Sequence, residues 1–287
     1  MLKFYLFLGN LRLIYIKTKD MKRLLSVLIL TTSLTVLSFA QTETPQRPQG
    51  QGPRMEMPPA SPQNALKFAF KPDMKFVDRI MYGAYAEANS NVTSTDVVFI
   101  GDSITQNWYT FHHDFFDLNG FLARGIGGQT SISVLCRFRQ DVIKNNPKVV
   151  AIMIGTNDVA QNDGVIADEN YIDNVVAMCD QARANNIKVL LCSIPPCDLL
   201  GWNQSVKPGP EIIRLNKILK EYADATDGIT YVDYFPVIGN GKDGLKDEFT
   251  TDRCHPTAEA YCEMERHIVK EIQKVLGTDK EYYVTPR

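Results

Sequence analysis

Four short polar segments of the sequence carry the residue types that acyl transfer to water requires. This reaction needs a nucleophile, a base that deprotonates it, a group that orients the base, and hydrogen-bond donors that face the developing oxyanion. In chain order the segments are Gly101-Asp102-Ser103, Gly127-Gly128-Gln129, Gly155-Thr156-Asn157-Asp158 and Asp252-Arg253-Cys254-His255-Pro256. Each segment alone is typical of a turn or a helix cap. Their joint occurrence in this order predicts ester hydrolysis.

Each of the four chemical requirements has a candidate in these segments. We expect Ser103 to be the nucleophile, His255 the base and Asp252 the group that orients the base. An Asp and a His this close in sequence can converge on one Ser when they lie on a loop that leads into a helix. Gly128 and Asn157 supply donors to the oxyanion. A Ser at a helix start also lies near unpaired N–H groups and the positive end of the helix dipole, which favour an anion.

The elements that must position these residues follow from the hydrophobic pattern. Short apolar runs rich in β-formers alternate with stretches of helical periodicity. The runs that predict strands are 97–100, 121–123, 149–154, 189–192 and 229–232, and the helical stretches are 132–144, 170–186, 211–225 and 257–276. Continuous apolar strands separated by helices indicate a single α/β domain whose parallel sheet is covered on both faces. In such folds ligands bind beyond the carboxyl ends of the strands, so we expect the polar segments to meet there.

The four segments resemble the signature blocks of the SGNH hydrolases, also called GDSL-type esterases and lipases. The resemblance extends over residues 97–275. It implies a flavodoxin-like domain with a five-stranded parallel sheet flanked by helices, and it implies no metal and no cofactor. It also implies that the backbone N–H of Ser103 joins Gly128 and Asn157 in the oxyanion hole. In the same family pattern His255 acts as a general base and then as a general acid.

Cysteine chemistry is a separate question. Cys254 lies beside the expected base, at a position whose side chain the family's chemistry does not use. Export would permit disulfides among the six cysteines. Cys197 and Cys254 are the best candidate pair, because both follow strand ends, and the alternative is six mostly buried thiols.

Aromatic and histidine residues outside the four segments give further candidates. Trp108, which follows the nucleophile segment, and Trp202, in a Pro-rich stretch, are candidates for substrate binding. Most aromatic residues after Ser103 are nevertheless expected in the core. His112-His113 resembles a pair of metal ligands, but no Cys, Asp or Glu partner stands at a recognisable spacing, so no metal site is predicted.

Composition and the N-terminal residues exclude several classes of protein. The chain has 287 residues, of which 44% are hydrophobic and 22% charged, and a formal net charge of -2. This balance is typical of a globular protein, and no nucleic-acid partner is expected because phosphate binding needs a strong basic excess.

Met21-Lys22-Arg23 and the apolar run 24–39 resemble a signal peptide with cleavage after Ala40. The expected regions are 1–40, a mis-called start plus a signal peptide; 41–63, a Pro/Gln-rich linker; and 64–287, the hydrolase domain. The product would be periplasmic or secreted, without stable membrane insertion, and the alternative is a membrane anchor.

The sequence defines the bond type better than the substrate. We expect a serine esterase that removes short acyl groups, such as acetyl, from a carbohydrate or another polar alcohol. The segment between Phe235 and Asp252 is rich in Gly, Asp and Lys, and no long apolar insertion resembles a lipase lid. The alternatives are a lysophospholipase or general short-chain esterase, and a non-catalytic glycan- or lipid-binding relative of the same fold. The intact set of four residues argues for chemistry, because a binding module has no reason to keep all of them: Ser103, Asp252, His255 and Asn157. No oligomeric state is predicted.

Overall fold

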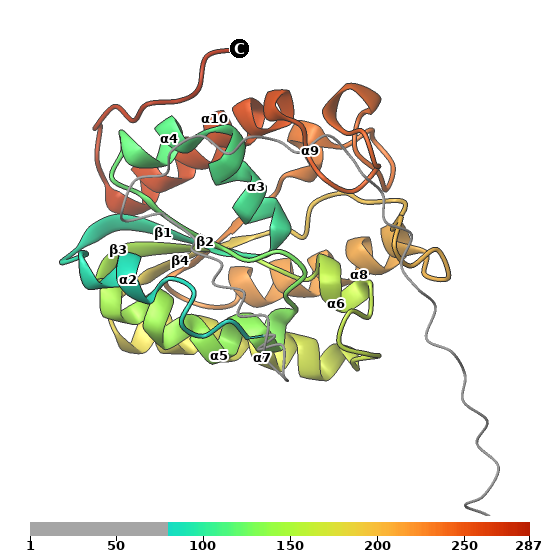
Figure 1. The fold of residues 1–287 in the computed structure, drawn as a ribbon, viewed down its shortest axis with the longest axis horizontal. Coiled ribbons are helices and arrows are strands. Elements are labelled where there is room, and N and C mark those ends of the chain that lie inside the picture. The colour runs from blue at the N-terminus through green and yellow to red at the C-terminus, as the bar shows by residue number, and fades with distance from the viewer. Residues whose placement is uncertain (1–79) are drawn as a thin grey trace, which may run out of the picture. The chain divides into compact units, whose positions relative to one another are not determined.

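The computed structural model describes residues 80–287. The expected signal peptide at 1–40 and linker at 41–63 therefore lie outside the described residues, as do the first residues of the expected hydrolase domain. Within 80–287 the chain forms one parallel sheet with helices on both of its faces (Figure 1).

Five parallel strands build the sheet, as the hydrophobic pattern predicted. They are β1 (Thr95–Gly101), β2 (Leu122–Gly125), β3 (Pro147–Met153), β4 (Lys188–Cys192) and β5 (Ile229–Val232). Their order across the sheet is β2-β1-β3-β4-β5. Val98 of β1 aligns with Leu122 on one side and Val150 on the other, and Val150 aligns with Val189. This register places a row of buried apolar side chains across the sheet.

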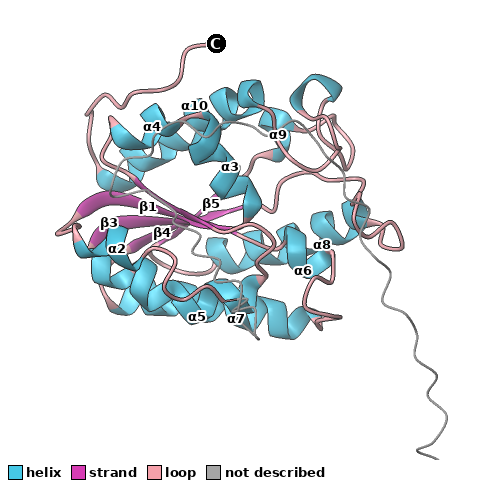
Figure 2. Cartoon of the chain, viewed as in Figure 1, coloured by secondary structure: helices cyan, strands magenta, loops and turns pink. Residues whose placement is uncertain are grey.

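Helices cover both faces of the sheet (Figure 2). One layer contains α5 (Ser131–Asp141), α7 (Asp168–Ala184) and α8 (Pro208–Asp224), and the other contains α3 (Ser103–Phe111), α4 (His113–Asp117) and α10 (Ala258–Leu276). The shorter helices are α2 (Ala86–Ser90), α6 (Thr156–Val159) and α9 (Phe235–Ile238), with 3-10 turns η1 (Ile143–Asn145) and η2 (Asp247–Phe249). The four predicted helices are confirmed, except that the first of them ends earlier and continues as η1.

Strand β3 shows why the strands are apolar throughout. Val150 and Ile152 pack into the layer of α5, α7 and α8, whereas Val149 and Ala151 pack into the layer of α3, α4 and α10. Successive side chains of a strand point to opposite faces. Because helices cover both faces, both sets of side chains are buried, and the polar–apolar alternation of a half-exposed strand is absent from β3.

Trp108 belongs to the core, so its prediction as a substrate-binding residue is wrong. Its side chain is 1% exposed. Its ring stacks 5.6 Å from Phe115 and 5.4 Å from Tyr261, and its Nε1 donates to the buried carboxylate of Glu265 at 3.1 Å. Helical periodicity places Trp108 with Ile104 on the buried face of α3. A ligand at the start of α3 therefore cannot reach the indole.

All six cysteines lie within the described residues and are free thiols. The candidate disulfide between Cys197 and Cys254 is thus not formed, although the two thiols are hydrogen-bonded neighbours in the apolar layer of α7 and α8. This hydrogen bond, together with burial, raises the pKa of Cys254. A buried, protonated thiol is a poor nucleophile, which agrees with a packing role for Cys254.

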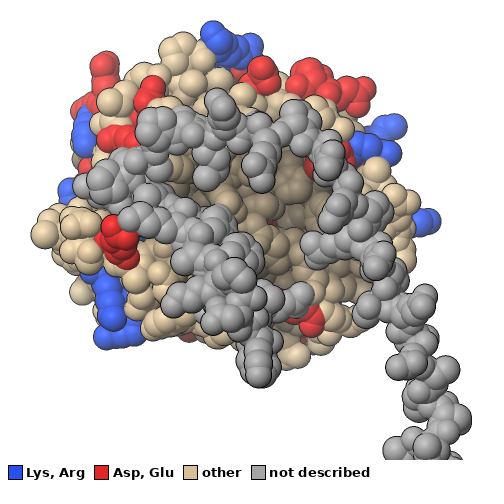
Figure 3. All heavy atoms as spheres, viewed as in Figure 1, with Lys and Arg blue, Asp and Glu red and all other residues tan. Residues whose placement is uncertain are grey.

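The surface of the described part carries charges of both signs. Lys and Arg side chains alternate with Asp and Glu around the periphery of the face in Figure 3. Among the helices of residues 80–287, none has the length and apolar character needed to cross a bilayer.

Candidate active site

Ser103 is the first residue of α3, directly beyond the carboxyl end of β1. Asp102 caps the helix, because its Oδ1 accepts a hydrogen bond from the Ile104 N–H at 2.9 Å. The N–H of a first helical residue has no intrahelical acceptor. The half-buried Ser103 hydroxyl thus lies beside this amide and at the positive end of the α3 dipole.

The loop before α10 brings the predicted base and its partner to this hydroxyl. The Ser103 Oγ and the His255 Nε2 are 3.0 Å apart, and the His255 Nδ1 is 2.7 Å from the Asp252 Oδ2. The other carboxylate oxygen, Oδ1, accepts hydrogen bonds from the amides of Cys254 at 2.9 Å and His255 at 2.7 Å. The carboxylate therefore holds both the backbone and the ring of His255. The structure thus brings the three predicted residues together.

Arg253 lies between Asp252 and His255 in the chain, and its exposed side chain anchors the loop that carries them. It adopts a left-handed backbone conformation with φ of 69°, and its N–H donates to the Thr250 Oγ1 at 2.9 Å. Its guanidinium forms two hydrogen bonds, of 2.9 and 2.8 Å, to the carboxylate of Asp198. Asp198 lies beyond β4, so this ion pair joins two of the loops at the carboxyl edge of the sheet.

The loop after β2, which carries Gly127 and Gly128, passes close to Ser103. A Cβ atom on Gly127 would lie 3.7 Å from the Ser103 Cβ, so the loop backbone passes close to the nucleophile. Gly128 has φ of 79°, a conformation that glycine adopts without strain. Within residues 80–287 the Gly128 N–H makes no hydrogen bond, which leaves it available to a ligand.

Asn157 follows β3 and is 3% exposed. Its Nδ2 donates to the backbone carbonyl of Gln129 at 3.0 Å and, with a longer contact of 3.3 Å, to the Asp102 Oδ2. Its Oδ1 accepts a hydrogen bond from the Asn162 Nδ2 at 2.7 Å. The turn into α6 depends on Gly155, whose φ is 137° and where a Cβ would meet Ile194 at 2.6 Å.

Comparison with known proteins agrees with this geometry. The sequence model of the GDSL-like lipase/acylhydrolase family matches residues 99–261, more than half of the chain. The chain belongs to this family. Among solved structures, a GDSL-like lipase from Bacteroides thetaiotaomicron VPI-5482 is 39% identical with a TM-score of 0.66, and the likeness covers 69% of this chain and 99% of that one.

Curated relatives match this GDSL-type chain over only part of their own length. A multidomain esterase of Ruminococcus flavefaciens is 27% identical over 165 residues, which are 56% of this chain and 19% of that protein. An uncharacterized lipoprotein, YqeF, of Bacillus subtilis (strain 168) is 35% identical over 78 residues, 26% of this chain and 32% of the relative. The chain thus spans about a third or less of the curated relatives that it matches.

The electrostatics of the GDSL-type site distinguish its carboxylates. Burial favours a higher pKa for Asp252, but the hydrogen bonds from the His255 ring and from two backbone amides outweigh it and lower the pKa. Burial likewise favours a lower pKa for His255, and the hydrogen bond and charge of Asp252 outweigh it, so the His255 pKa is raised. Burial raises the pKa of Asp102 to about 6 and that of Asp158 to about 7. Asp252 is therefore the carboxylate that stays ionised beside the imidazole.

The remaining candidates of this GDSL-type chain divide into two groups. Trp202 lies at the site: its side chain is 47% exposed and its ring centre is 5.9 Å from that of His255. His112 is in the core, with its Nδ1 2.6 Å from the Glu265 Oε1. Among the described residues no group of His, Cys, Asp and Glu could hold a metal ion.

Sequence reasoning missed Asn162, which lies in the turn after α6 and contacts Asn157. An Asn in a short polar turn carries no distinctive signal, because such residues are common in turns for local reasons. Only the fold shows that its side chain reaches the site.

Proposed function

We propose that this chain is a serine-dependent carboxylic-ester hydrolase with Ser103 as nucleophile, His255 as base and Asp252 as the group that orients His255. The observation that carries the proposal is the continuous hydrogen-bonded series from the Ser103 Oγ through the His255 ring to the Asp252 carboxylate. The family supports the reaction class, because its description covers lipases and acylhydrolases. One matched relative is named an esterase.

The geometry suggests the following sequence of steps. The Ser103 Oγ attacks the ester carbonyl while its proton passes to the His255 Nε2, and the resulting imidazolium is stabilised by Asp252. The tetrahedral oxyanion accepts hydrogen bonds from the N–H groups of Ser103 and Gly128 and from the Asn157 Nδ2. The alcohol leaves with the proton from His255, and an acyl-enzyme remains. Water, deprotonated by His255, then attacks this ester, and the acid is released as His255 returns the proton to the Ser103 Oγ.

The resting contacts of Asn157 indicate which of its protons serves the oxyanion. The 3.0 Å bond to the Gln129 carbonyl is short, whereas the 3.3 Å contact to Asp102 is long. Because this contact is long, Nδ2 loses little when the same proton turns to the oxyanion and forms a short, charge-assisted hydrogen bond. The proton now directed at Asp102 is the one we assign to the oxyanion.

For the substrate, we propose a short acyl group on a carbohydrate or another polar alcohol. His255 delivers the proton to the departing alcohol, so the alcohol lies on the His255 side of the site. The exposed Trp202 ring is on that side, and an indole offers an apolar face and a polar edge, which suits the C–H face and hydroxyls of a sugar ring. Polar groups also surround the loop, including the Arg253–Asp198 ion pair.

The test is a ladder of p-nitrophenyl esters from acetate to palmitate, with acetate release from acetylated oligosaccharides measured in parallel. We expect the highest kcat/KM at acetate or propionate and measurable acetate release, both absent from Ser103→Ala. Rates that rise steadily toward palmitate, with no acetate released, would contradict the substrate assignment and leave the esterase assignment intact. Equal turnover by the wild type and Ser103→Ala would contradict the esterase assignment.

We further propose that the protein is exported. The signal pattern before Ala40 supports this, as does the name of the Bacillus subtilis relative, a lipoprotein. Expression of the full chain in a bacterium, followed by fractionation and N-terminal sequencing, tests it. We expect a protein outside the cytoplasm that begins at Gln41. An uncleaved cytoplasmic chain would contradict the proposal.

A further inference from the structure

Asn162 connects both residues that carry oxyanion donors outside α3. Its Nδ2 donates to the Asn157 Oδ1 at 2.7 Å and to the Gly128 carbonyl at 3.2 Å, and its own N–H donates to the Asn157 carbonyl at 3.0 Å. A Cβ on Gly128 would lie 4.0 Å from the Asn162 Nδ2, so the two residues are in contact. The side chain of Asn162 is therefore a neighbour of the oxyanion hole and not part of it.

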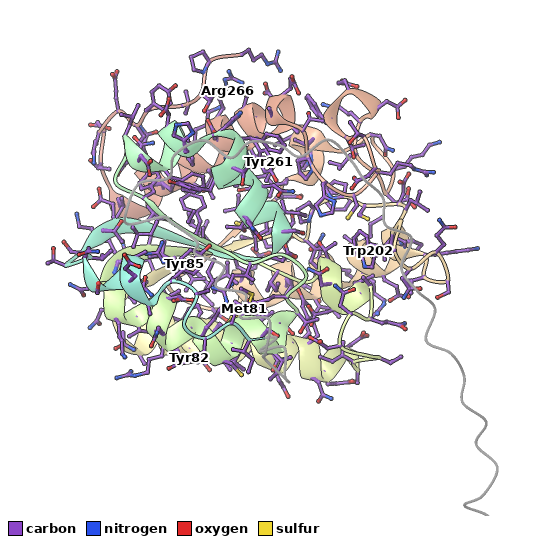
Figure 4. The ribbon with its side chains drawn as sticks, viewed as in Figure 1. Met81, Tyr82, Tyr85, Trp202, Tyr261 and Arg266 are labelled. Atoms are coloured by element: carbon purple, nitrogen blue, oxygen red, sulfur yellow. The ribbon has the colours of Figure 1, made fainter. Side chains whose placement is uncertain are left out.

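Trp202 contacts the other end of the same amide. Its Nε1 donates to the Asn162 Oδ1 at 2.9 Å. Trp202 lies on the loop ahead of α8 (Figure 4), so this bond joins a third segment to the β2 loop that carries Gly128 and to α6, which carries Asn157. The indole N–H is a donor and never an acceptor. It therefore fixes which end of the Asn162 amide faces Trp202 and which end faces Asn157.

The polarity of these contacts matters because an Asn amide has two ends of similar size and opposite hydrogen-bonding character. If the Asn157 amide were reversed, its oxygen would occupy the position of Nδ2 and would repel the oxyanion. The Asn162 Nδ2, a donor, and the Gln129 carbonyl, an acceptor, both select the orientation in which the Asn157 Nδ2 contacts Asp102. In the reversed orientation, the Asn157 NH₂ group would face the Asn162 NH₂ group, and the Asn157 oxygen would face the Gln129 carbonyl oxygen.

We propose that Trp202 and Asn162 form a polarity relay that fixes the Asn157 amide in its donor orientation, with Asn162 as a positioning residue. The inference rests on the proposed function, in which Asn157 stabilises the oxyanion. The relay runs from the indole N–H through the Asn162 amide to the Asn157 Oδ1. The relay acts on the transition state, so its loss lowers kcat and leaves KM nearly unchanged.

A double-mutant cycle tests the relay. We expect Asn162→Ala to lower kcat by about 10-fold, a part of the 10²–10³ that loss of a whole donor typically costs. In the Asn157→Ala background the same substitution should lower kcat less than about 3-fold, because residues that act through one another are not additive. Trp202→Phe keeps a ring and removes the N–H, so it should lower kcat several-fold on a small ester. An undiminished effect of Asn162→Ala in the Asn157→Ala background would overturn the proposal.

Asn203→Ala is the matched control. The Asn203 Nδ2 donates to the Ala160 carbonyl at 3.0 Å, so it joins the same two segments without contacting Asn157 or Gly128. We expect its kcat to equal the wild-type value, and a loss as large as that of Asn162→Ala would show loop anchoring instead of a relay and overturn the proposal.

A readout independent of turnover separates this inference from the proposed function. In ¹H–¹⁵N spectra, the side-chain NH₂ pair of Asn157, assigned by its loss in Asn157→Ala, should shift or broaden in Asn162→Ala and Trp202→Phe and stay in place in Asn203→Ala. Unchanged signals in Asn162→Ala would overturn the relay even if the enzyme is an esterase. Altered signals in a protein without Ser103-dependent turnover would support the relay and contradict the proposed function.

Discussion

The Ser103 Oγ and the His255 Nε2 lie 3.0 Å apart although 152 positions separate them in the chain. Packing between α3 and α10 supports this distance. The Tyr261 hydroxyl of α10 donates to the Ile104 carbonyl of α3 at 2.7 Å, and its ring stacks against Trp108. The first turns of the two helices are thus joined close to the reacting atoms, and the loop that carries His255 leads directly into α10.

Ser103→Ala and His255→Ala should each lower kcat/KM for a short ester by about 10⁴ or more, because each removes a member of a catalytic unit. Neither change leaves a large cavity, so circular dichroism and the melting temperature should stay close to wild type. Assays need an esterase-deficient host, with a mock purification as the control. Substantial turnover by pure Ser103→Ala would exclude it as the nucleophile.

Asn157→Ala should lower kcat by about 10²–10³ with little change in KM, since a preorganised donor acts mainly in the transition state. The expected signature is a matched loss in kcat and kcat/KM for p-nitrophenyl acetate. A rise in KM at constant kcat would instead assign Asn157 to substrate binding.

The pH dependence follows from the raised pKa of His255. The imidazole must be neutral to accept the Ser103 proton, so kcat/KM should rise with pH through an apparent pKa above the ordinary value of about 6.5. A profile measured in buffers of constant ionic strength checks this. A midpoint at or below the ordinary value would mean that Asp252 does not raise the His255 pKa in solution.

Asp252→Asn tests the same interaction from the other partner. The hydrogen bond and the charge of Asp252 both raise the His255 pKa, so loss of the charge should move the acidic limb of kcat/KM to lower pH. The plateau should fall by an amount on the order of 10⁴, as expected when the base loses its orienting carboxylate. A lower plateau with an unmoved limb would assign Asp252 to orientation alone.

Asp158 should make the protein less stable as pH rises from about 4 to 7. Its carboxylate accepts hydrogen bonds from the Ser131 N–H and hydroxyl, yet burial raises its pKa to about 7 in the folded chain. A raised carboxylate pKa means that the folded state binds the proton more tightly, so its contribution to the free energy of unfolding falls over this range. The effect is at most on the order of 4 kcal/mol.

Urea denaturation at several pH values measures this effect. Asp158→Asn should reduce the fall of the unfolding free energy with rising pH. Asp173→Asn, at an exposed position of α7, should keep the wild-type dependence on pH. Equal slopes for the wild type and Asp158→Asn would show that the buried carboxylate is not the cause.

Much of the fold was predictable because the relevant signals are local. The five strands are short apolar runs, and β5 begins and ends at the predicted residues. The long helices repeat apolar residues at helical spacing, and α10 ends at Leu276, because the next residue, Gly277, adopts a left-handed conformation. The prediction that Trp108 binds substrate was wrong because the sheet and helix α10, which are distant in sequence, determine which face of α3 is buried.

By itself, the sequence determined the order of strands and helices along the chain. It also determined which reactive side chains follow the strands, Ser103 and Asn157, and which precede the last helix, Asp252 and His255. These depend on local periodicity and on side-chain chemistry. The tertiary structure alone decided that Trp202 joins the site through Asn162, because that hydrogen bond spans two loops whose separation depends on how α6 and α8 pack. Contacts between loops depend on the sum of many packing interactions, and no single segment of sequence contains that sum.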